Sequence, residues 1–192
     1  KKIKFRIKNI YLRLATNDQN MNYIYTLAKL LRISDTSFIK SMSSFVGLPH
    51  RHEIFLKKGG ITFINDSKAT SFQSSRFALA SSKNIYWIVG GLPKEKDKID
   101  FKNIKNNITK SYIIGKNISF FKKQLNNKVK FTIKKTLRKA IISALKDMKQ
   151  SDETNKVILL SPGAASFDQF ENFERRGNEF KKLSKIYAKK FI

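Results

Sequence analysis

The chain has no cysteine, and only three prolines and eight glycines occur among its 192 residues. Without cysteine it cannot form a disulfide, a cysteine-containing zinc site or a thiol nucleophile, a composition that fits a reducing compartment. No apolar run approaches the roughly 20 residues that a membrane-spanning helix needs. The first residues alternate basic and apolar side chains and lack the continuous apolar stretch of a signal peptide. We therefore expect no association with a membrane.

Acidic residues are also scarce, with 14 against 40 basic ones, which gives a net charge of +26. Such an excess is typical of proteins that bind nucleic acid or an anionic membrane. A nucleic-acid footprint requires clustered charge, however, and these lysines are spread along the whole chain. The abundance of Lys, Ile, Asn and Phe is the pattern that an AT-rich coding sequence would give. We favour compositional drift and keep a basic α/β nucleic-acid-binding module as the alternative.

Apolar periodicity divides the chain into two parts. Before Gly47 it indicates strands at 2–7 and 11–14, followed by two helices. The first helix presents apolar residues from Met21 to Leu31, and Asp35 is the expected N-cap of the second. The sequence Gly47-Leu48-Pro49 interrupts the helical pattern. We therefore predict two domains, 1–46 and 47–192.

Beyond this boundary, short apolar runs alternate with amphipathic stretches. The expected strands are 53–56, 61–65, 84–89, 111–114, 129–133 and 157–160. The expected helices are 70–82, 119–125, 136–149 and a last one that begins near Asp168 and runs to about Lys190. This alternation is typical of an α/β fold, a Rossmann-like mostly parallel sheet with flanking helices. Ligands of such sheets bind outside the carboxyl ends of the strands.

Three unusual loops follow strands and should meet at that edge. Asp66 to Thr70 offers a carboxylate, an ammonium and two hydroxyls beside a helix N-terminus, which favours an anion. Gly90 to Lys94 places paired glycines before a cation, and Ser161 to Ser166 is rich in small residues. Each loop alone is also compatible with an ordinary turn or a helix cap. Together they predict a site for an anionic small molecule.

Two other kinds of site lack their signature. His50 and His52 are close in sequence but have no third ligand beside them, so we expect no metal site in this chain. No Gly-x-x-x-x-Gly-Lys-Ser/Thr loop is present. The chain therefore cannot supply the main cradle for a nucleotide triphosphate.

Three stretches resemble the D-glutamate-adding branch of the Mur ligase family. They are Gly-Leu-Pro-His-Arg at 47–51, Asn-Asp-Ser-Lys-Ala-Thr at 65–70, and the long stretch 160–180. The Asp-Ser-Lys-Ala-Thr form separates this branch from its sister ligases. The segment 17–20 is similar to the family's His-Asn-x-x-Asn segment, with Thr16 in place of the histidine, and Ala164 stands where many members have cysteine. The resemblance covers nearly the whole chain.

This resemblance implies a cytoplasmic, monomeric enzyme of peptidoglycan synthesis. Residues 1–46 would be the C-terminal part of the central ATP-binding domain, and 47–192 the Mur ligase C-terminal domain. ATP would phosphorylate the L-alanyl carboxylate of UDP-N-acetylmuramoyl-L-alanine, and the amine of D-glutamate would then displace phosphate. The UDP-binding domain, the phosphate loop and the Mg²⁺ ligands would lie upstream, so we expect this chain alone to be inactive. A different Mur or folylpolyglutamate-type ligase is the rival within the same fold, and no specific nucleic acid is expected.

The resemblance also implies roles on the nucleotide side. Asn17 and Asn20 would contact adenine. His50 and Arg51 would line the nucleotide side of a cleft between domains. Asp66 would hold the ribose hydroxyls, a task suited to an acceptor with two oxygens.

The remaining implied roles concern the reaction and its amino-acid substrate. The catalytic candidates are Lys68, Thr70 and His50. The candidates for binding the phosphate and D-glutamate are Lys68, Thr70, Lys94, Ser166 and Phe173. A dicarboxylate needs a cation and hydroxyl or backbone donors, and Lys94 can supply a charge-assisted hydrogen bond.

Overall fold

The structure is a computed structural model that describes residues 6–9, 12 and 17–192. It divides into two compact units, Lys1–Leu48 and Pro49–Ile192. The strands predicted over 2–7 and 11–14 fall on stretches with residues outside the described ones, and they stay predictions.

The first unit contains helices α2 (Asp18–Leu30) and α3 (Asp35–Ser44). Met21 and Ala28 are the buried residues of α2, and they cluster with Phe38 of α3. The prediction that Asp35 caps α3 is wrong. Ser34 is the cap, because its side-chain oxygen accepts a hydrogen bond from the backbone N–H of Ser37 at 3.2 Å. The carboxylate of Asp35 instead accepts from the Tyr25 hydroxyl at 3.0 Å.

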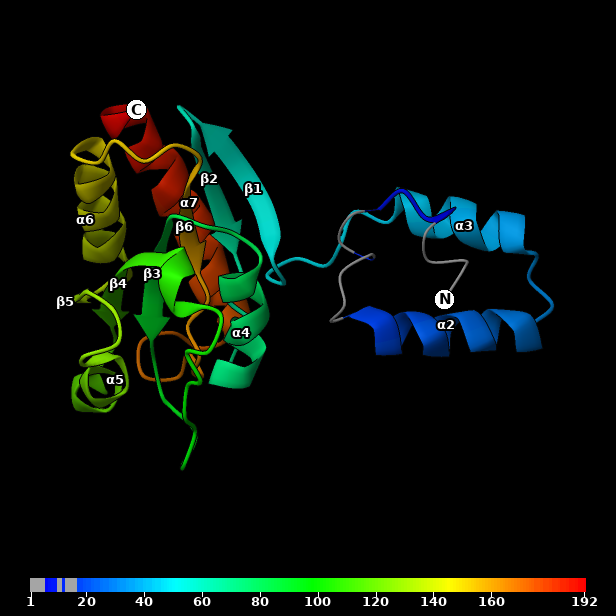
Figure 1. The fold of residues 1–192 in the computed structure, drawn as a ribbon, viewed down its shortest axis with the longest axis horizontal. Helices are drawn as coiled ribbons and strands as arrows, with labels where there is room; N and C mark the ends of the chain where they lie inside the picture. The colour runs from blue at the N-terminus through cyan, green and yellow to red at the C-terminus, as the bar shows by residue number, and fades with distance from the viewer. Residues whose placement is uncertain (1–5, 10–11, 13–16) are drawn as a thin grey trace. The chain divides into compact units, whose positions relative to one another are not determined.

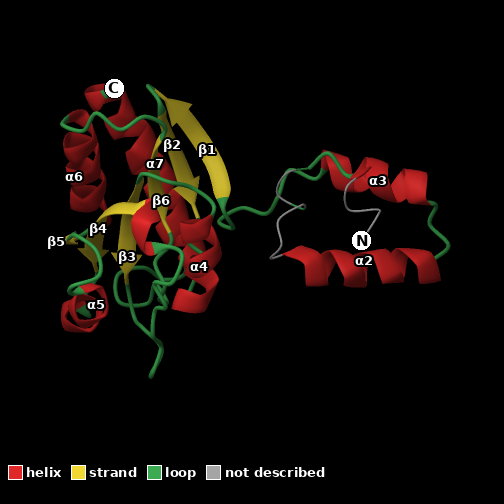
Figure 2. Cartoon of the chain, in the orientation of Figure 1, coloured by secondary structure: helices red, strands yellow, loops and turns green. Residues whose placement is uncertain are grey.

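The second unit is built on a six-stranded sheet (Figures 1 and 2). Its strands are β1 (Glu53–Lys58), β2 (Ile61–Asn65), β3 (Ile85–Gly90), β4 (Ile108–Ile114), β5 (Phe131–Lys135) and β6 (Lys156–Leu160). Their order is β1-β2-β6-β3-β4-β5. All neighbouring pairs are parallel except β1 and β2, which form an antiparallel hairpin that turns at Gly59 and Gly60. The predicted α/β class with a mostly parallel sheet is confirmed.

Helices cover both faces of this sheet. Helices α6 (Leu137–Lys149) and α7 (Phe173–Phe191) share one buried apolar cluster with the sheet and pack on one face. Helices α4 (Phe72–Ala80) and α5 (Ile118–Leu125) belong to a second cluster and pack on the other face. A single turn of 3-10 helix, η2 (Lys105–Asn107), precedes β4. None of the helices that the structure describes combines the length and the apolar character of a membrane-spanning segment.

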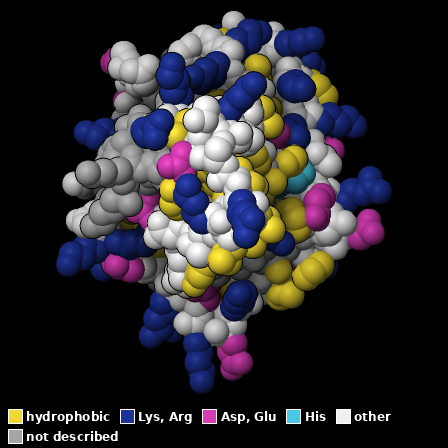
Figure 3. Space-filling view, turned by 90° about the vertical axis from the view of Figure 1, so that its right-hand side faces the viewer, with side chains coloured by type: hydrophobic (Ala, Val, Ile, Leu, Met, Phe, Trp, Pro, Cys, Tyr) yellow, Lys and Arg dark blue, Asp and Glu magenta, His cyan; other side chains and the backbone are white. Residues whose placement is uncertain are grey.

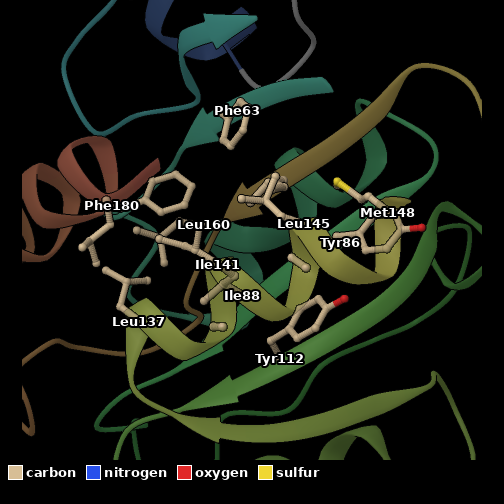
Figure 4. Close-up of a cluster of buried hydrophobic side chains, with 14 of the residues drawn as sticks. Phe63, Tyr86, Ile88, Tyr112, Leu137, Ile141, Leu145, Met148, Leu160 and Phe180 are labelled. Carbon is tan, nitrogen blue, oxygen red and sulfur yellow. The ribbon is translucent and has the colours of Figure 1, made fainter. Parts of the chain in front are cut away.

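The central strand β3 is buried at all six positions, because it has helices above and below it. Ile88 faces the α6 and α7 side, where it clusters with Leu160, Ile141 and Phe180 (Figure 4). Trp87 faces the α4 and α5 side. This two-sided burial explains why the strand appears in the sequence as a continuous apolar run rather than an alternating one.

The last helix begins later than predicted. Its cap is Asn172, whose side-chain oxygen accepts from the backbone N–H of Arg175 at 2.8 Å. The carboxylate of Asp168, the expected starting point, instead accepts from the backbone N–H of Lys116 in the loop after β4, at 2.8 Å. Because Asp168 binds another loop, residues between Ser166 and Asn172 form turns along the carboxyl edge of the sheet.

Candidate active site

Asp66 follows β2 directly and is held by the neighbouring strand β6. Its backbone N–H donates to the carbonyl of Leu160 at 2.8 Å, and its carboxylate accepts from the Ser161 hydroxyl at 2.7 Å. The backbone N–H of His52 donates to the other carboxylate oxygen at 3.1 Å. Burial raises the pKa of Asp66 to about 7, although these two hydrogen bonds and the charge of Arg51 act in the opposite direction. The folded chain therefore holds a proton on Asp66 more tightly than an unfolded chain does.

Ser67 connects the same loop to the start of α7 through Arg176. The hydroxyl of Ser67 donates to the Phe173 carbonyl at 2.8 Å and accepts from Arg176 Nε at 3.0 Å. Arg176 Nη2 donates to the carbonyl of Ser67 at 2.8 Å and to that of Ala164 at 3.0 Å. Burial lowers the pKa of Arg176 to about 10, so the side chain stays charged at neutral pH. One buried cation thus joins the loops after β2 and β6 to α7.

Lys68 and His50 both lie against Phe173. The Lys68 ammonium is 4.0 Å from the centre of the Phe173 ring. The His50 ring meets the same ring edge-on, with 5.9 Å between centroids and 80° between planes. The backbone N–H of Lys68 donates to the carbonyl of His50 at 3.0 Å. The segment before β1 and the loop after β2 therefore meet at the first residue of α7.

His50 is 6% exposed, and its imidazole is already engaged. Burial and the charge of Lys181 lower its pKa, which favours the neutral ring at neutral pH. Nδ1 then accepts from the Asn65 amide at 2.9 Å. A Cβ atom on Gly177 would lie 2.2 Å from this nitrogen, so α7 can approach His50 only with glycine at that position. The structure shows His50 packed between β2 and α7.

Lys94 and Ser166 are brought toward each other by a backbone bridge. Leu92 N–H donates to the Ala165 carbonyl at 2.8 Å, and Ala165 N–H donates back to Leu92 at 3.0 Å. Lys94, two residues after Leu92, is exposed, whereas Ser166 is 2% exposed. The approach requires Gly91, because a Cβ atom there would lie 2.3 Å from the Ala165 carbonyl oxygen.

The other predicted site residues divide between the two units. Thr70 is half-buried in the segment between Ala69 and α4. The carbonyl of Ala69 accepts a hydrogen bond from the backbone N–H of Gly163. Arg51 is exposed beside His50. Asn17 precedes α2 and Asn20 lies exposed on its first turn, so both belong to the first unit.

The predicted residues of the second unit thus share one edge of the sheet. They follow the carboxyl ends of β2, β3 and β6, or precede β1, whose antiparallel direction brings its amino end to that same edge. They are His50, Arg51, Asp66, Lys68, Thr70, Lys94, Ser166 and Phe173. Two of the three loops contribute lysines, so an anion is the ligand that this edge favours. Among the described residues, no group of three or more His, Asp or Glu side chains is placed to hold a metal ion.

Comparison with known proteins identifies relatives of this chain. No family model matches the chain. The UDP-N-acetylmuramoylalanine--D-glutamate ligase of Rickettsia felis is 38% identical over 172 residues, which cover 90% of this chain and 38% of that protein. Ligases of the same name from Rhizobium meliloti and from Wolbachia of Brugia malayi are 38% and 39% identical and cover 88% of this chain. This chain belongs to the Mur ligase family.

Membership of the Mur ligase family confirms the resemblance carried by the three sequence stretches. The chain spans 34% to 38% of the length of these three relatives. Among solved structures, the bifunctional folylpolyglutamate synthase/dihydrofolate synthase from Yersinia pestis CO92 aligns with this chain at 14% identity and a TM-score of 0.45. The alignment covers 77% of this chain and 34% of the Yersinia chain. A likeness this partial does not bear on function.

The sequence did not reveal the roles of the buried residues whose hydrogen bonds hold the loops of this Mur ligase edge together. Arg176, Ser67, Asn65 and Ser161 are all buried and hydrogen-bonded there. From the sequence alone, Arg176 would be expected on the solvent-exposed face of a helix, because it lies in a run of polar residues. The available signal was its place beside Gly177, inside the long stretch that resembles the family.

Proposed function

We propose that this chain is part of a cytoplasmic ligase that uses ATP to add D-glutamate to UDP-N-acetylmuramoyl-L-alanine during peptidoglycan precursor synthesis. The observation that carries the proposal is the 37% to 39% identity with ligases of that name over 86% to 90% of this chain. Because the chain spans only about a third of those proteins, the reaction is proposed for the complete ligase. The chain by itself is expected to be inactive.

D-Glutamate is proposed to bind between the loops after β3 and β6. A dicarboxylate needs a cation with freedom to reach it and fixed donors beside that cation. Lys94 is exposed, and the bridge between Leu92 and Ala165 holds its loop beside Ser166. Thr70 adds a half-buried hydroxyl from the loop after β2. This combination supports recognition of a small diacid.

The nucleotide is proposed to lie on the other side of the same edge. Each carboxylate oxygen of Asp66 accepts one hydrogen bond, from Ser161 or from the His52 backbone, and keeps a lone pair for a ribose hydroxyl. Arg51 is exposed nearby and available to phosphate oxygens. The contact of Asn17 and Asn20 with adenine that the family resemblance implies stays a proposal for the complete ligase.

The reaction then needs little covalent chemistry from the chain. A carboxylate oxygen of the L-alanyl group attacks the γ-phosphorus of ATP, and ADP leaves. The D-glutamate amine attacks the carbonyl carbon of the acyl-phosphate, and the tetrahedral intermediate expels phosphate as the amine loses a proton. Lys68 is proposed to neutralise the phosphate, and the chain would act mainly by positioning the reactants. Mg²⁺ supplies charge neutralisation to phosphoryl transfer. The described residues form no group that fits the ion, so we propose that its ligands lie elsewhere in the ligase.

An NMR titration of the 192-residue chain tests the amino-acid site. We expect D-glutamate to shift the backbone resonances of Lys94 and Ser166, and L-glutamate to do so at several-fold higher concentration. Lys94→Ala should weaken the D-glutamate response about tenfold, the effect of losing a charge-assisted bond. Lys98→Ala, which removes an exposed lysine of the same loop, is the matched control. Equal responses to both enantiomers, or equal losses in both variants, would sink the proposed substrate.

We propose no second function for the positive charge of the chain. On the face shown in Figure 3, lysine and arginine side chains are interspersed with acidic, apolar and uncharged ones. A gel shift with RNA and DNA tests the basic-module alternative. Binding that survives about 0.2 M salt would favour that alternative, because non-specific attraction to phosphate weakens steeply over this range.

A further inference from the structure

The first residue of α7 provides a surface on which the Lys68 ammonium rests. Lys68 Nζ is 4.0 Å from the centre of the Phe173 ring, well inside the range of a cation–π contact. Among the residues that the structure describes, no carboxylate lies within ion-pairing distance of this ammonium. We infer that Phe173 is a positioning residue for Lys68, a platform that directs the free N–H groups of the ammonium toward an oxyanion of the ligase reaction.

The platform is fixed from three directions. Phe173 is the first residue of α7, and the side chain of Asn172 caps that helix. Its carbonyl accepts from the Ser67 hydroxyl at 2.8 Å, and Ser67 is itself held by the buried Arg176. Its ring meets the edge of His50, which is locked by Asn65. These three contacts restrain the position of the ring.

The base of Lys68 is fixed as well. Its backbone N–H donates to the His50 carbonyl at 3.0 Å, and the following residue, Ala69, closes a turn back to Asp66 at 2.9 Å. Only the four-carbon side chain remains free to move. A free lysine side chain loses considerable conformational entropy when it binds a ligand. Because the Phe173 ring already restrains the Lys68 ammonium, less of this entropy is lost on binding.

The geometry leaves the ammonium available to a ligand. An ammonium has three donors, and a ring face engages it from one side only. The opposite side can then donate to a phosphate or carboxylate oxygen without leaving the ring. This inference rests on the proposed function, in which Lys68 neutralises the phosphate, and it adds the residue that positions the ammonium.

Proton chemical shifts of Lys68 report the contact directly. Protons over the face of an aromatic ring are shifted upfield, so the Hε protons of Lys68 should be shifted upfield in the ligand-free 192-residue chain. Phe173→Leu should return them to ordinary positions, and Phe173→Tyr should restore the upfield shift. Lys190 over Tyr187, with 6.0 Å between ammonium and ring centre, is the internal control and should not change in either variant. Ordinary Lys68 shifts in the unsubstituted chain would overturn the inference.

Anion binding separates a platform from mere packing. Inorganic phosphate, ADP and D-glutamate are titrated separately to distinguish phosphate from carboxylate as the oxyanion. At least one should perturb Lys68 Hε while the upfield shift persists. Affinity for that anion should fall about two- to fivefold in Phe173→Leu and recover in Phe173→Tyr. Trifluorination of the Phe173 ring, which weakens its negative face with little change of size, should lower affinity without changing the fold. A role in packing alone would not respond to this change.

The outcomes distinguish this inference from the proposed function. Collapse of the upfield shift on anion binding, no anion response at Lys68, or unchanged affinity in Phe173→Leu would each overturn the platform. If the platform behaves as expected but D-glutamate and L-glutamate bind alike, the proposed substrate fails and the platform stands. If enantiomer selectivity holds while Phe173→Leu binds every anion normally, the platform fails and the substrate stands.

Discussion

Arg176 Nε lies 3.0 Å from the hydroxyl of Ser67, across more than a hundred residues of sequence. The guanidinium also reaches the carbonyls of Ser67 and Ala164, and its side chain is 1% exposed. Burying a cation is costly unless polar partners surround it. Here the Ser67 hydroxyl and the backbone carbonyls of the two loops that carry the candidate ligand residues accept from Nε and Nη2, whereas Nη1 is buried without a partner among the described residues. The geometry of the site therefore depends on a residue that is not proposed to touch the ligand.

Replacing this cation should damage stability strongly. In Arg176→Ala the carbonyls of Ser67 and Ala164 lose their buried donor, and we expect the free energy of unfolding to fall by about 3 kcal/mol. Urea denaturation of the 192-residue chain measures it. Arg175→Ala removes the neighbouring exposed arginine and should change stability by less than about 0.5 kcal/mol. Similar stability of the two variants would contradict this account of Arg176.

Asp66 should make stability depend on pH in an unusual direction. Its folded pKa of about 7 lies above the value near 4 of an unfolded chain, so the folded state holds the proton more tightly. Stability from this group is therefore full below pH 4 and is lost as pH rises toward 7, by an amount on the order of 4 kcal/mol. Asp66→Asn should remove that slope. Asp100→Asn, at an exposed carboxylate, should keep it. Parallel pH profiles for Asp66→Asn and the unsubstituted chain would argue against the raised pKa.

Gly91 and Gly60 provide a matched test of the close approach between the loops after β3 and β6. Both Gly91 and Gly60 have positive φ, but a Cβ atom would meet the Ala165 carbonyl at Gly91 and open space at Gly60. We expect Gly60→Ala to cost about 1 kcal/mol from backbone strain, and Gly91→Ala to cost about 3 kcal/mol because overpacking is added. Gly91→Ala should also abolish the D-glutamate response at Lys94, since it separates Leu92 from Ala165. Equal costs for the two substitutions would contradict the bridge.

Lys68→Ala should affect turnover more than folding. Lys68 is half-buried, and its ammonium lies over a ring face without an ion pair to any described carboxylate, so its removal should cost less than about 1 kcal/mol of stability. In the complete ligase, loss of charge neutralisation at the phosphate should lower kcat about a hundredfold or more. Lys57→Ala, at an exposed position of β1, should leave kcat unchanged. Normal turnover with reduced stability would reverse the assignment of Lys68.

The sequence predicts the sheet well because burial leaves a direct signature. A strand covered on both faces, such as Ile85–Gly90, must be apolar throughout, and Gly90 and Gly91 mark its end. All six strands of the second unit were expected within a few residues of their bounds. The parallel arrangement then brings the loops at 66–70, 90–94 and 161–166 to one edge without further information.

Residues that serve distant partners were not predictable in the same way. Asp168 is a reasonable helix cap locally, but its carboxylate binds Lys116 from another loop, and the helix starts at Phe173. Arg176 has the sequence context of a solvated charge, and only the fold shows that it is enclosed. Contacts between segments far apart in sequence leave no local pattern, so periodicity cannot reveal them.

The central claim is that this chain belongs to a ligase whose incoming amino acid is D-glutamate. Its most direct measurement is ATP-dependent ligation by the complete ligase that contains this chain, with UDP-N-acetylmuramoyl-L-alanine and, separately, D-glutamate, L-lysine or diaminopimelate, followed by mass spectrometry. We predict a product with D-glutamate that forms together with ADP and phosphate, and none with the other two amino acids. A product with L-lysine or diaminopimelate but not with D-glutamate would contradict the claim.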